Sequence, residues 1–487
     1  MVVFKSLSDS CAQTVQNVLE YHSFSVLLAL CAVFLSIYLL FRPRKSYKLP
    51  PGPNGLPLVG YLPFLSSEPY RDLDRLKRKY GGIFSIYMGR TYTVILDDFE
   101  IVKEAFSKST TTDRPPKLFD FLPDGVGFSS VNGNEWVEQR RYCVRAMRDL
   151  GLGRTVWETL VQEEVDDLIK IVKEQNGKPV NIAKWLTSSV SNNVLSLLFG
   201  RRMAVDDPRR KILDQSVNVV SQFFKQTGIR NFFPAVCDVL VKLGISEYAR
   251  LYKKMVDFNS YVRKEVERHK SDSSIERRET FIDGYLQEMK KRENNITNTF
   301  NDRNLHGNLQ AIFIGGSDTT RTSINWLLLT MAKFPNIQKK VQEEIDRVLG
   351  KDGKITWSER TSLPYTFAVI MEEQRWKTIA PLNTSRIAME DIKIGGYDIP
   401  KGTTIIANNW GLHNDPKYWK DPENFDPERF LLNDGKQVNF KPESYVPFSY
   451  GKRNCPGETI AMMEILLYFV AFMQKFKVLA PEGAKPK

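Results

Sequence analysis

One cysteine near the C-terminal end constrains this chain more than any other residue. It lies in the segment Phe448–Glu458, which reads FSYGKRNCPGE, and the apolar stretch Thr459–Phe472 follows it with the pattern of a helix. Gly451 and Gly457 bracket Cys455 and permit unusual backbone angles. A cysteine in a loop that opens into a helix lies near the positive end of the helix dipole and near free backbone N–H groups, which stabilise a thiolate. The sequence therefore predicts that Cys455 is a thiolate ligand of a metal.

The alternative is a buried free cysteine, which is the commoner state of a single cysteine. The whole pattern F-x-x-G-x-R-x-C-x-G argues against it, because here the chain resembles the cytochrome P450 family. In that family the cysteine thiolate is the proximal ligand of the haem iron, so the resemblance implies haem b as the cofactor and Cys455 as its metal ligand. Within the same loop, Phe448 is suited to packing against the macrocycle and Arg453 to pairing with a haem propionate.

A second pattern resembles the way the family grips the propionates. Trp136 and Arg140 match W-x-x-x-R, and one helical turn between them places the indole donor and the guanidinium on a single face. The resemblance assigns two further propionate contacts to Arg386 and Arg114. These four residues complete the predicted haem contacts outside the cysteine loop.

A third pattern, E-x-x-R, occurs at Glu372 and Arg375, about eighty residues before the cysteine. Positions three apart on a helix share a face, so the two side chains can form an ion pair. An isolated E-x-x-R is usually an ordinary surface salt bridge. The resemblance instead implies a buried structural lock behind the haem loop, which the family completes with a later arginine, here Arg429.

The segment Ala311–Thr320 resembles the family's distal helix, in which small residues leave room for dioxygen. Gly315 and Gly316 each disfavour a regular helix by about 1 kcal/mol relative to alanine, so their adjacency predicts a functional kink. The resemblance assigns Thr319 to hydrogen-bonding the iron-bound oxygen and Asp318 to relaying protons. The alternative role for Thr319 is that of a helix-capping hydroxyl.

Electrons must come from another protein, because the chain has no dinucleotide-binding, flavin or iron–sulfur motif. The resemblance implies NADPH–cytochrome P450 reductase as the donor, with NADPH used indirectly through that flavoprotein, and cytochrome b5 as a second candidate partner. Arg141, Arg145 and Arg148 share a helix face beside Trp136, and with Lys452 they could form a basic dock for an acidic flavoprotein. A simple solvated face is the alternative.

The net charge of +12 agrees with an anionic partner, which can be a nucleic acid, a membrane surface or an acidic protein. No zinc-finger spacing and no run of alternating basic and aromatic residues is present, so a nucleic-acid partner is not expected. Membrane lipid and a redox protein remain. The five scattered cysteines, without C-x-x-C spacing, predict a reducing, cytosolic environment.

An uncharged apolar run, Phe24–Phe41, is close to the length that crosses a bilayer as a helix, and Arg42, Arg44, Lys45 and Lys48 follow it. By the positive-inside rule the rest of the chain lies in the cytosol. A cleaved signal peptide is the alternative, but the run is long and no A-x-A site follows. We expect a single-pass anchor within residues 1–41, a basic and proline-rich hinge at 42–53, and an endoplasmic reticulum location.

The rest of the chain, residues 54–487, predicts a mixed α+β, mainly α-helical cytochrome P450 fold with small β-sheets. Strand patterns occur at 83–88, 92–96, 392–394 and 403–407, and long amphipathic helical patterns fill the middle of the chain. The family usually continues further past its cysteine, so the late β hairpin that contacts substrate is expected to be missing. By analogy with the family's substrate-contact segments, the pocket candidates are Phe119, Phe121, Phe223, Phe224, Phe313 and the segment from Ile379 to Leu382.

The apolar character of these candidates predicts a lipophilic small-molecule substrate. The segment Trp136–Arg154 resembles animal microsomal members that oxidise steroids, terpenoid hormones, fatty acids or foreign compounds. The predicted function is therefore NADPH-supported monooxygenation with O2. A haem-thiolate isomerase or dehydratase, and a non-catalytic haem sensor or carrier, are the alternatives; the pair Asp318–Thr319 argues against both.

Overall fold

The computed structural model describes residues 47–116, 127–150, 155–204, 207–219, 234–244, 246–271, 280–295 and 298–481, together with residues 33, 222 and 483. The chain divides into two units, Met1–Lys48 and Leu49–Lys487. Within these described ranges, no helix is both long and apolar enough to cross a membrane. The expected anchor at 24–41 lies outside them except for Val33, so the anchor stays a prediction.

The second unit contains one sheet of four strands in the order β1-β2-β6-β3. β1 and β2 form an antiparallel hairpin, and β2 runs parallel to β6, with Thr93 opposite Thr404. The strands of this sheet are β1 (Ile83–Met88), β2 (Thr91–Leu96), β3 (Arg386–Ile387) and β6 (Thr404–Ala407). Two small hairpins are formed by β4 (Ile392–Ile394) with β5 (Tyr397–Ile399) and by β7 (Leu431–Leu432) with β8 (Gln437–Val438). The four strand predictions are confirmed within one residue at each end.

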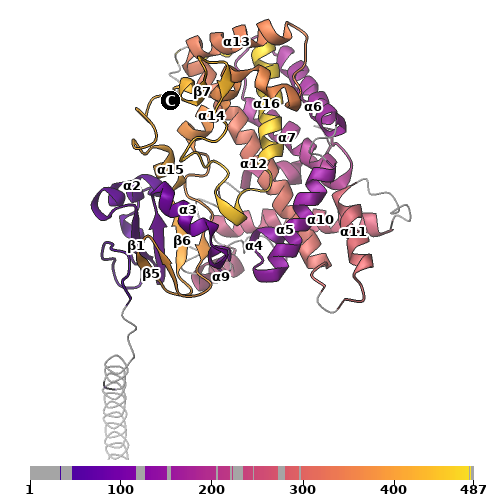
Figure 1. Ribbon diagram of the computed structural model, residues 1–487. Coiled ribbons are helices and arrows are strands. Elements are labelled where there is room, and N and C mark those ends of the chain that lie inside the picture. Colours follow the sequence, from indigo (N-terminus) through magenta and orange to yellow (C-terminus); the bar gives the residue numbers. More distant parts are fainter. Residues whose placement is uncertain are drawn as a thin grey trace, which may run out of the picture. The chain divides into compact units, whose positions relative to one another are not determined.

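Helices make up most of the second unit, and Figure 1 shows α2 and α3 beside β1, whereas α6, α7, α12, α13 and α16 lie on the side away from it. They are α2 (Pro69–Tyr80), α3 (Phe99–Ser107), α4 (Gly127–Ser130), α5 (Gly133–Leu150), α6 (Thr155–Lys173), α7 (Ile182–Phe199), α9 (Pro234–Leu243), α10 (Glu247–Ser271), α11 (Phe281–Lys291), α12 (Asp302–Lys333), α13 (Pro335–Leu349), α14 (Pro364–Lys377), α15 (Asn409–His413) and α16 (Glu458–Lys475). The prediction of a mainly helical fold with small sheets is confirmed.

The longest helix, α12, runs through the core. The Asn301 side chain caps it by accepting a hydrogen bond from the Asn304 N–H, which satisfies one of the free donors at its N-terminus. Its sides pack against α7, α4, α16, α10 and α14. The helix continues without a break through Gly315 and Gly316, so the expected kink is not marked by any interruption of the helix.

Candidate active site

The cysteine loop is held in one conformation by its own backbone and by α3. The Cys455 N–H donates to the Phe448 carbonyl at 2.8 Å, which closes the loop. Gly451 has a φ of +75°, and a Cβ there would lie 1.9 Å from the Phe106 carbonyl oxygen, so only glycine fits. The chain therefore presents Cys455 at the end of a tight loop, just before α16 begins.

The side chain of Cys455 keeps exposed surface although protein atoms surround its thiol. Desolvation by that surrounding protein raises the pKa of the thiol. A hydrogen bond with the backbone of Gly457 and the charge of Arg140 act in the opposite direction and favour the thiolate. These two groups oppose the effect of desolvation only in part, since the pKa of the thiol is raised on balance.

One exposed face of α12 is made of small residues. In a helix that is otherwise largely buried, Gly315 and Thr319 are exposed one turn apart. A Cβ at Gly315 would have no heavy atom within 4 Å, whereas one at Gly316 would lie 3.1 Å from Val194. The Thr319 hydroxyl donates to the Gly315 carbonyl at 2.7 Å, so it bonds within the helix rather than capping its end. One narrow cavity is lined by Thr319, Phe448 and Ile379, and thus joins α12 to the cysteine loop.

Asp318, the predicted proton relay, is mostly buried and forms an ion pair with Arg321 one turn further along α12. Burial raises the pKa of Asp318, while the charge and hydrogen bond of Arg321 hold it down. Arg321 was not among the residues predicted from the sequence. The i, i+3 spacing of an acid and an arginine on a predicted helix was the signal that could have found it.

Three buried arginines and the partly buried Arg140, from distant parts of the chain, converge near the loop. Burial and mutual repulsion lower the pKa of Arg386 to about 8; they lower the pKa of Arg453 to about 8 and that of Arg114 to about 10. Burial also lowers the pKa of Arg140. Such a concentration of buried cations is costly unless an anion compensates it.

Several donors in this cluster have no hydrogen-bond partner among the described residues. They are the indole Nε1 of Trp136, Nε and Nη1 of Arg386, and Nε of Arg114. Buried donors are rarely left unsatisfied in folded proteins. The cations and the free donors together fit a group that carries carboxylates, and the residues present therefore fit the propionates of a haem.

The other bonds of these residues go to the protein. Arg140 donates to the carbonyl and the side-chain oxygen of Asn454 at 2.7 and 2.8 Å, which ties α5 to the residue before Cys455. Arg453 differs from the rest, because all three of its guanidinium nitrogens donate to backbone carbonyls, those of Thr112, Phe128 and Val131. Its guanidinium also lies 4.1 Å from the centre of the Trp136 ring. Its pairing with a propionate stays a prediction.

The structure brings the predicted lock residues together. The Glu372 carboxylate accepts two hydrogen bonds from Arg375, each at 2.7 Å, and both side chains are fully buried. Arg429 Nε donates to the same carboxylate at 3.2 Å. Arg375 also donates to the carbonyl of His413 at 2.8 Å, so the lock ties α14 to the segment that precedes the cysteine loop.

The predicted pocket residues are only partly described. Phe119, Phe121, Phe223 and Phe224 lie outside the described residues. Phe313 is fully buried and packs against Phe258 of α10, with ring centres 5.1 Å apart, so it belongs to the core in this structure. Ile379 lines the narrow cavity beside Thr319. Leu382 instead packs against a cluster of buried apolar side chains from the four-stranded sheet and α2.

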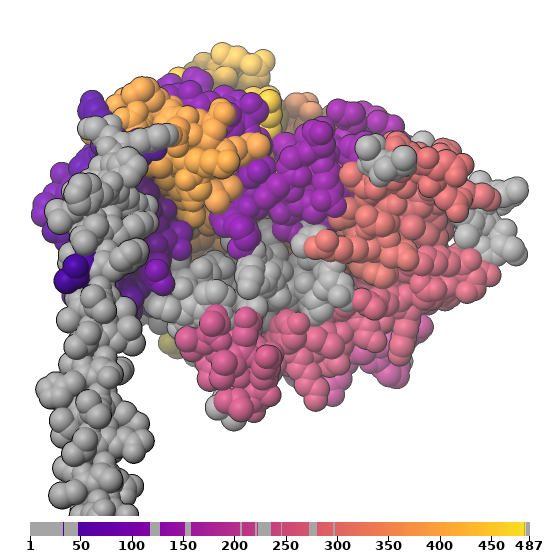
Figure 2. Space-filling view, turned by 90° about the horizontal axis from the view of Figure 1, so that it is seen from below, coloured from indigo at the N-terminus to yellow at the C-terminus, as the bar shows by residue number. Residues whose placement is uncertain are grey.

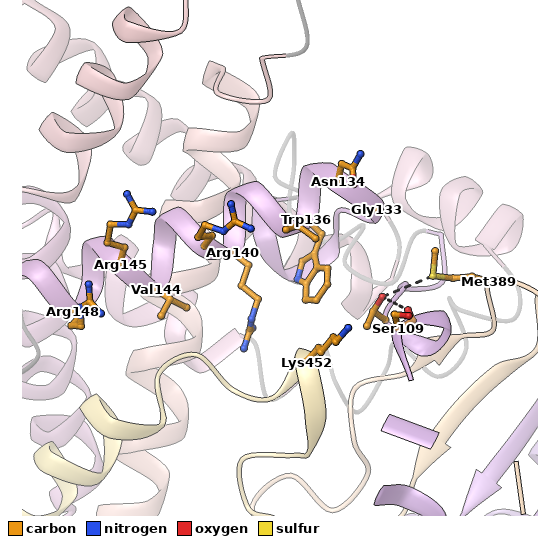
Figure 3. A pocket seen from close by; sticks show the side chains of 13 residues that line it. Ser109, Gly133, Asn134, Trp136, Arg140, Val144, Arg145, Arg148, Met389 and Lys452 are labelled. Carbon is orange, nitrogen blue, oxygen red and sulfur yellow. Dashed lines mark hydrogen bonds between the residues drawn. The ribbon is translucent and has the colours of Figure 1, made fainter. Parts of the chain in front are cut away.

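The predicted basic dock forms one wall of a groove of about 770 Å³, shown in Figure 3. Arg141, Arg145 and Arg148 are exposed along α5, and Lys452 of the cysteine loop reaches the same groove. Exposed Val137 and Val144 lie among them. Arg140 also lines the groove, so one residue connects this surface with Asn454 beside the cysteine.

Buried cations with free donors, a thiol in a tight loop and a helix face of small residues fit the class of haem-thiolate oxidoreductases. The family model described as Cytochrome P450 matches residues 50–487. The chain is 35% identical to Cytochrome P450 2J5 of Mus musculus over 93% of this chain and 90% of the relative. It is 35% identical to Cytochrome P450 2J2 of Homo sapiens, over 95% and 92%, and 30% identical to Cytochrome P450 18a1 of Drosophila melanogaster, over 95% and 87%.

The chain therefore belongs to the cytochrome P450 family. It is an oxidoreductase of the monooxygenase class with haem iron as its cofactor and NADPH-derived electrons from a redox partner.

Proposed function

We propose that this protein inserts one atom of O2 into a lipophilic small molecule of the steroid, terpenoid hormone, fatty acid or foreign-compound classes. The observation that carries the proposal is the placement of Thr319 on the exposed small-residue face of α12, next to Asp318 and across the narrow cavity from Phe448 of the cysteine loop. An isomerase or dehydratase does not need such an acid and alcohol for oxygen activation, because its reaction consumes no O2 and no net protons.

When bound, haem supplies the activation of dioxygen. Cys455 Sγ would bind the iron as a thiolate, and ligation would release the thiol proton. The Gly457 backbone and Arg140 stabilise that negative charge. Trp136, Arg386 and Arg114 hold free donors for the propionates, and Arg140 adds its charge.

We propose that two neighbouring residues of α12 handle the oxygen and the proton. The Thr319 hydroxyl already donates to the Gly315 carbonyl, so it is oriented before any ligand arrives and can turn its lone pairs to the narrow cavity. Asp318 is its neighbour in sequence and is the nearest acid on the same helix. We assign Thr319 to binding and orienting oxygen, and Asp318 to holding the proton.

The experiment that tests this function uses Thr319→Ala with NADPH, a reductase and a lipophilic compound that shifts the haem spectrum on binding. We expect NADPH consumption to continue while peroxide release per NADPH rises and oxygenated product falls. Thr322→Ala, which removes a threonine hydroxyl from another position on the same helix, is the matched control. Product formation without NADPH consumption would instead establish the isomerase reading, and unchanged coupling in Thr319→Ala would remove Thr319 from the mechanism.

NADPH–cytochrome P450 reductase is the proposed electron donor, and the groove beside α5 is its proposed dock. The exposed arginines offer charge to an acidic flavoprotein, and Val137 and Val144 offer apolar contact at the centre of a polar rim. Arg145→Glu should weaken binding of the reductase and reduce the salt dependence of its association. Exposed Arg90→Glu serves as the control for Arg145→Glu. Arg201→Glu would be a poor control, because the substitution would break the ion pair that Arg201 forms.

We further propose a single-pass anchor in the endoplasmic reticulum membrane with the catalytic unit in the cytosol. The support is the apolar run 24–41 with its basic flank and an apolar surface on α9, where Val236, Val239 and Leu243 are more than half exposed. Figure 2 shows one face of the molecule, on which the chain around α9 and α10 forms part of the surface in pink. Resistance of the full chain to alkaline extraction from microsomes, with the catalytic unit open to added protease, is the expected result.

A further inference from the structure

The short helix α15 ends in a histidine that binds two separate parts of the wall of the narrow cavity. One part is the end of α14, where Thr378 and Ile379 line the cavity, and another is the start of the cysteine loop, where Phe448 lines it. Figure 1 shows α15 between α14 and α2. His413 is fully buried and is not one of the described residues that line this cavity. It therefore acts on the cavity only through the residues that it binds.

The hydrogen bonds of His413 fix which ring nitrogen carries the proton. The Val446 N–H donates to Nε2 at 2.9 Å, so Nε2 is the acceptor. Burial lowers the pKa of His413 to about 3, and a neutral imidazole carries its one proton on the other nitrogen. Nδ1 therefore donates to the Thr378 hydroxyl at 2.9 Å, and that hydroxyl donates to the Arg375 carbonyl at 2.6 Å. The imidazole thus has a different task on each of its two sides.

On the side of α14, the bond holds a residue in an uncommon conformation. Thr378 has φ +37° and ψ +72°, in the left-handed region that a β-branched residue seldom adopts. Such a conformation persists only where the surroundings impose it. Here the Thr378 hydroxyl is held between His413 and the Arg375 carbonyl. The direction in which the chain leaves α14 is fixed at this residue, and Ile379 follows it into the cavity wall.

On the other side, the bond holds the start of the cysteine loop. The Val446 N–H is bound by His413, and the Val446 carbonyl accepts from the Ser449 N–H at 3.0 Å. Phe448, two residues after Val446, lines the cavity and closes the loop through its carbonyl, which accepts from the Cys455 N–H at 2.8 Å. One buried side chain therefore joins the substrate side of the cavity to the loop that carries the thiolate.

We propose that His413 is a positioning residue that sets where the Ile379 part of the cavity wall stands relative to the cysteine loop, and thereby which ligands fit beside the haem iron. The inference rests on the proposed function and adds a residue that controls its specificity. The alternative is a buried histidine that only stabilises the fold. In that case every substitution of His413 would change all properties together, in proportion to the stability that is lost.

Two substitutions separate the two hydrogen bonds. The side-chain amide of asparagine reaches about as far as Nδ1, so His413→Asn keeps a donor for Thr378 and loses the acceptor for the Val446 N–H. The amide of glutamine reaches about as far as Nε2, so His413→Gln keeps that acceptor and loses the donor to Thr378. Thr378→Ala removes the same bond from its other end, and Thr378→Ser retains the hydroxyl.

The measurements are made on the resting haem-loaded protein, without turnover. Imidazole and 4-phenylimidazole both bind haem iron through a ring nitrogen, and only the second carries a phenyl group that must fit within the cavity walls. The ratio of their dissociation constants, from spectral titrations, therefore reports the position of the wall, and the reduction potential of the haem reports the thiolate loop. We expect His413→Gln and Thr378→Ala to change the ratio by at least about threefold, which is the effect of one lost hydrogen bond, with the potential near that of wild type. His413→Asn should shift the potential and leave the ratio, and Thr378→Ser should restore the wild-type ratio.

The control is His269→Gln, which removes another buried histidine, one that pairs with Asp283 at 2.7 Å. It should lower stability to urea without moving the ratio or the potential. An unchanged ratio in both His413→Gln and Thr378→Ala, or a ratio and a potential that move together in every His413 variant, overturns the positioning role. If His413→Gln loses its haem, the comparison of Thr378→Ala with Thr378→Ser decides the same bond. Failure of the wild type to form oxygenated product would instead refute the proposed function, and the titrations would still decide the role of His413.

Discussion

Replacing Glu372 with leucine should strongly destabilise the protein, because it leaves a buried arginine without its counter-charge. The carboxylate accepts two hydrogen bonds from Arg375 at 2.7 Å, one from Arg429 at 3.2 Å and one from the Asp426 N–H at 2.9 Å. The side chains of Glu372 and Arg375 have no exposed surface. After the substitution, Arg375 keeps its bonds to the carbonyls of His413 and Asn424 but has lost its counter-charge.

The expected decrease in the free energy of unfolding follows from the loss of this counter-charge. Removing one partner of a buried ion pair costs about 3–5 kcal/mol, since the remaining charge is left uncompensated in the interior. Whole domains are stable by roughly 5–15 kcal/mol, so the change would remove about a fifth or more of the total. Glu372→Leu combined with Arg375→Leu removes both charges, and it should cost clearly less than the sum of the two single changes.

The assay is urea unfolding at fixed pH, followed by tryptophan fluorescence and by the haem absorbance band. The control is Glu100→Gln, which breaks another i, i+3 pair, that with Lys103 at 3.5 Å, whose side chains are about half exposed. That exposed pair should contribute at most about 1 kcal/mol. A cost for Glu372→Leu equal to that of Glu100→Gln, or strict additivity in the double variant, would refute the buried-lock reasoning.

Three further substitutions have directions that the structure fixes. Arg386→Met removes two free donors and a buried cation, so haem should transfer faster to a scavenger protein while the haem-free chain becomes more resistant to urea; slower transfer would contradict the assignment. Burial lowers the pKa of His413 to about 3. The unfolded chain therefore binds the extra proton first, and stability should fall by about 1.4 kcal/mol per pH unit as the pH drops from about 6 toward 3. His413→Asn should flatten that slope in urea titrations, and an unchanged slope would point to other groups. Gly451→Ala places a Cβ against the Phe106 carbonyl at positive φ, so haem content after expression should fall sharply, whereas full haem content would show that the loop can shift.

Local pattern was enough for the elements that the chain builds from neighbouring residues. The strand-forming residues at 83–88 predicted β1, and the spacing of Glu372 and Arg375 placed both side chains on one face of a helix, where the structure has them paired. The third member of that set, Arg429, is 57 residues away from Glu372. It could be named only through the resemblance, since nothing in its surroundings indicates which acid it meets.

The converging arginines could not be derived as a cluster. Arg114, Arg386 and Arg453 come from separate loops and strands, and their mutual repulsion exists only once the chain is folded. The same limit applies to Phe313, which was a pocket candidate by analogy with the family's substrate-contact segments and whose contact with the Phe258 ring no local pattern indicates. It also explains Asn454, whose two bonds from Arg140 join α5 to the cysteine loop across 314 positions of sequence.

Ligation of the haem iron by Cys455 is the centre of this interpretation, and the spectrum of the reduced protein with carbon monoxide tests it most directly. Wild type and Cys455→Ser are compared as full chains, with haem content measured in both. A strongly red-shifted Soret band in wild type that is absent from Cys455→Ser is the predicted result. An unshifted band in wild type that retains a full complement of haem, or a red-shifted band that survives in Cys455→Ser, would contradict thiolate ligation by this residue.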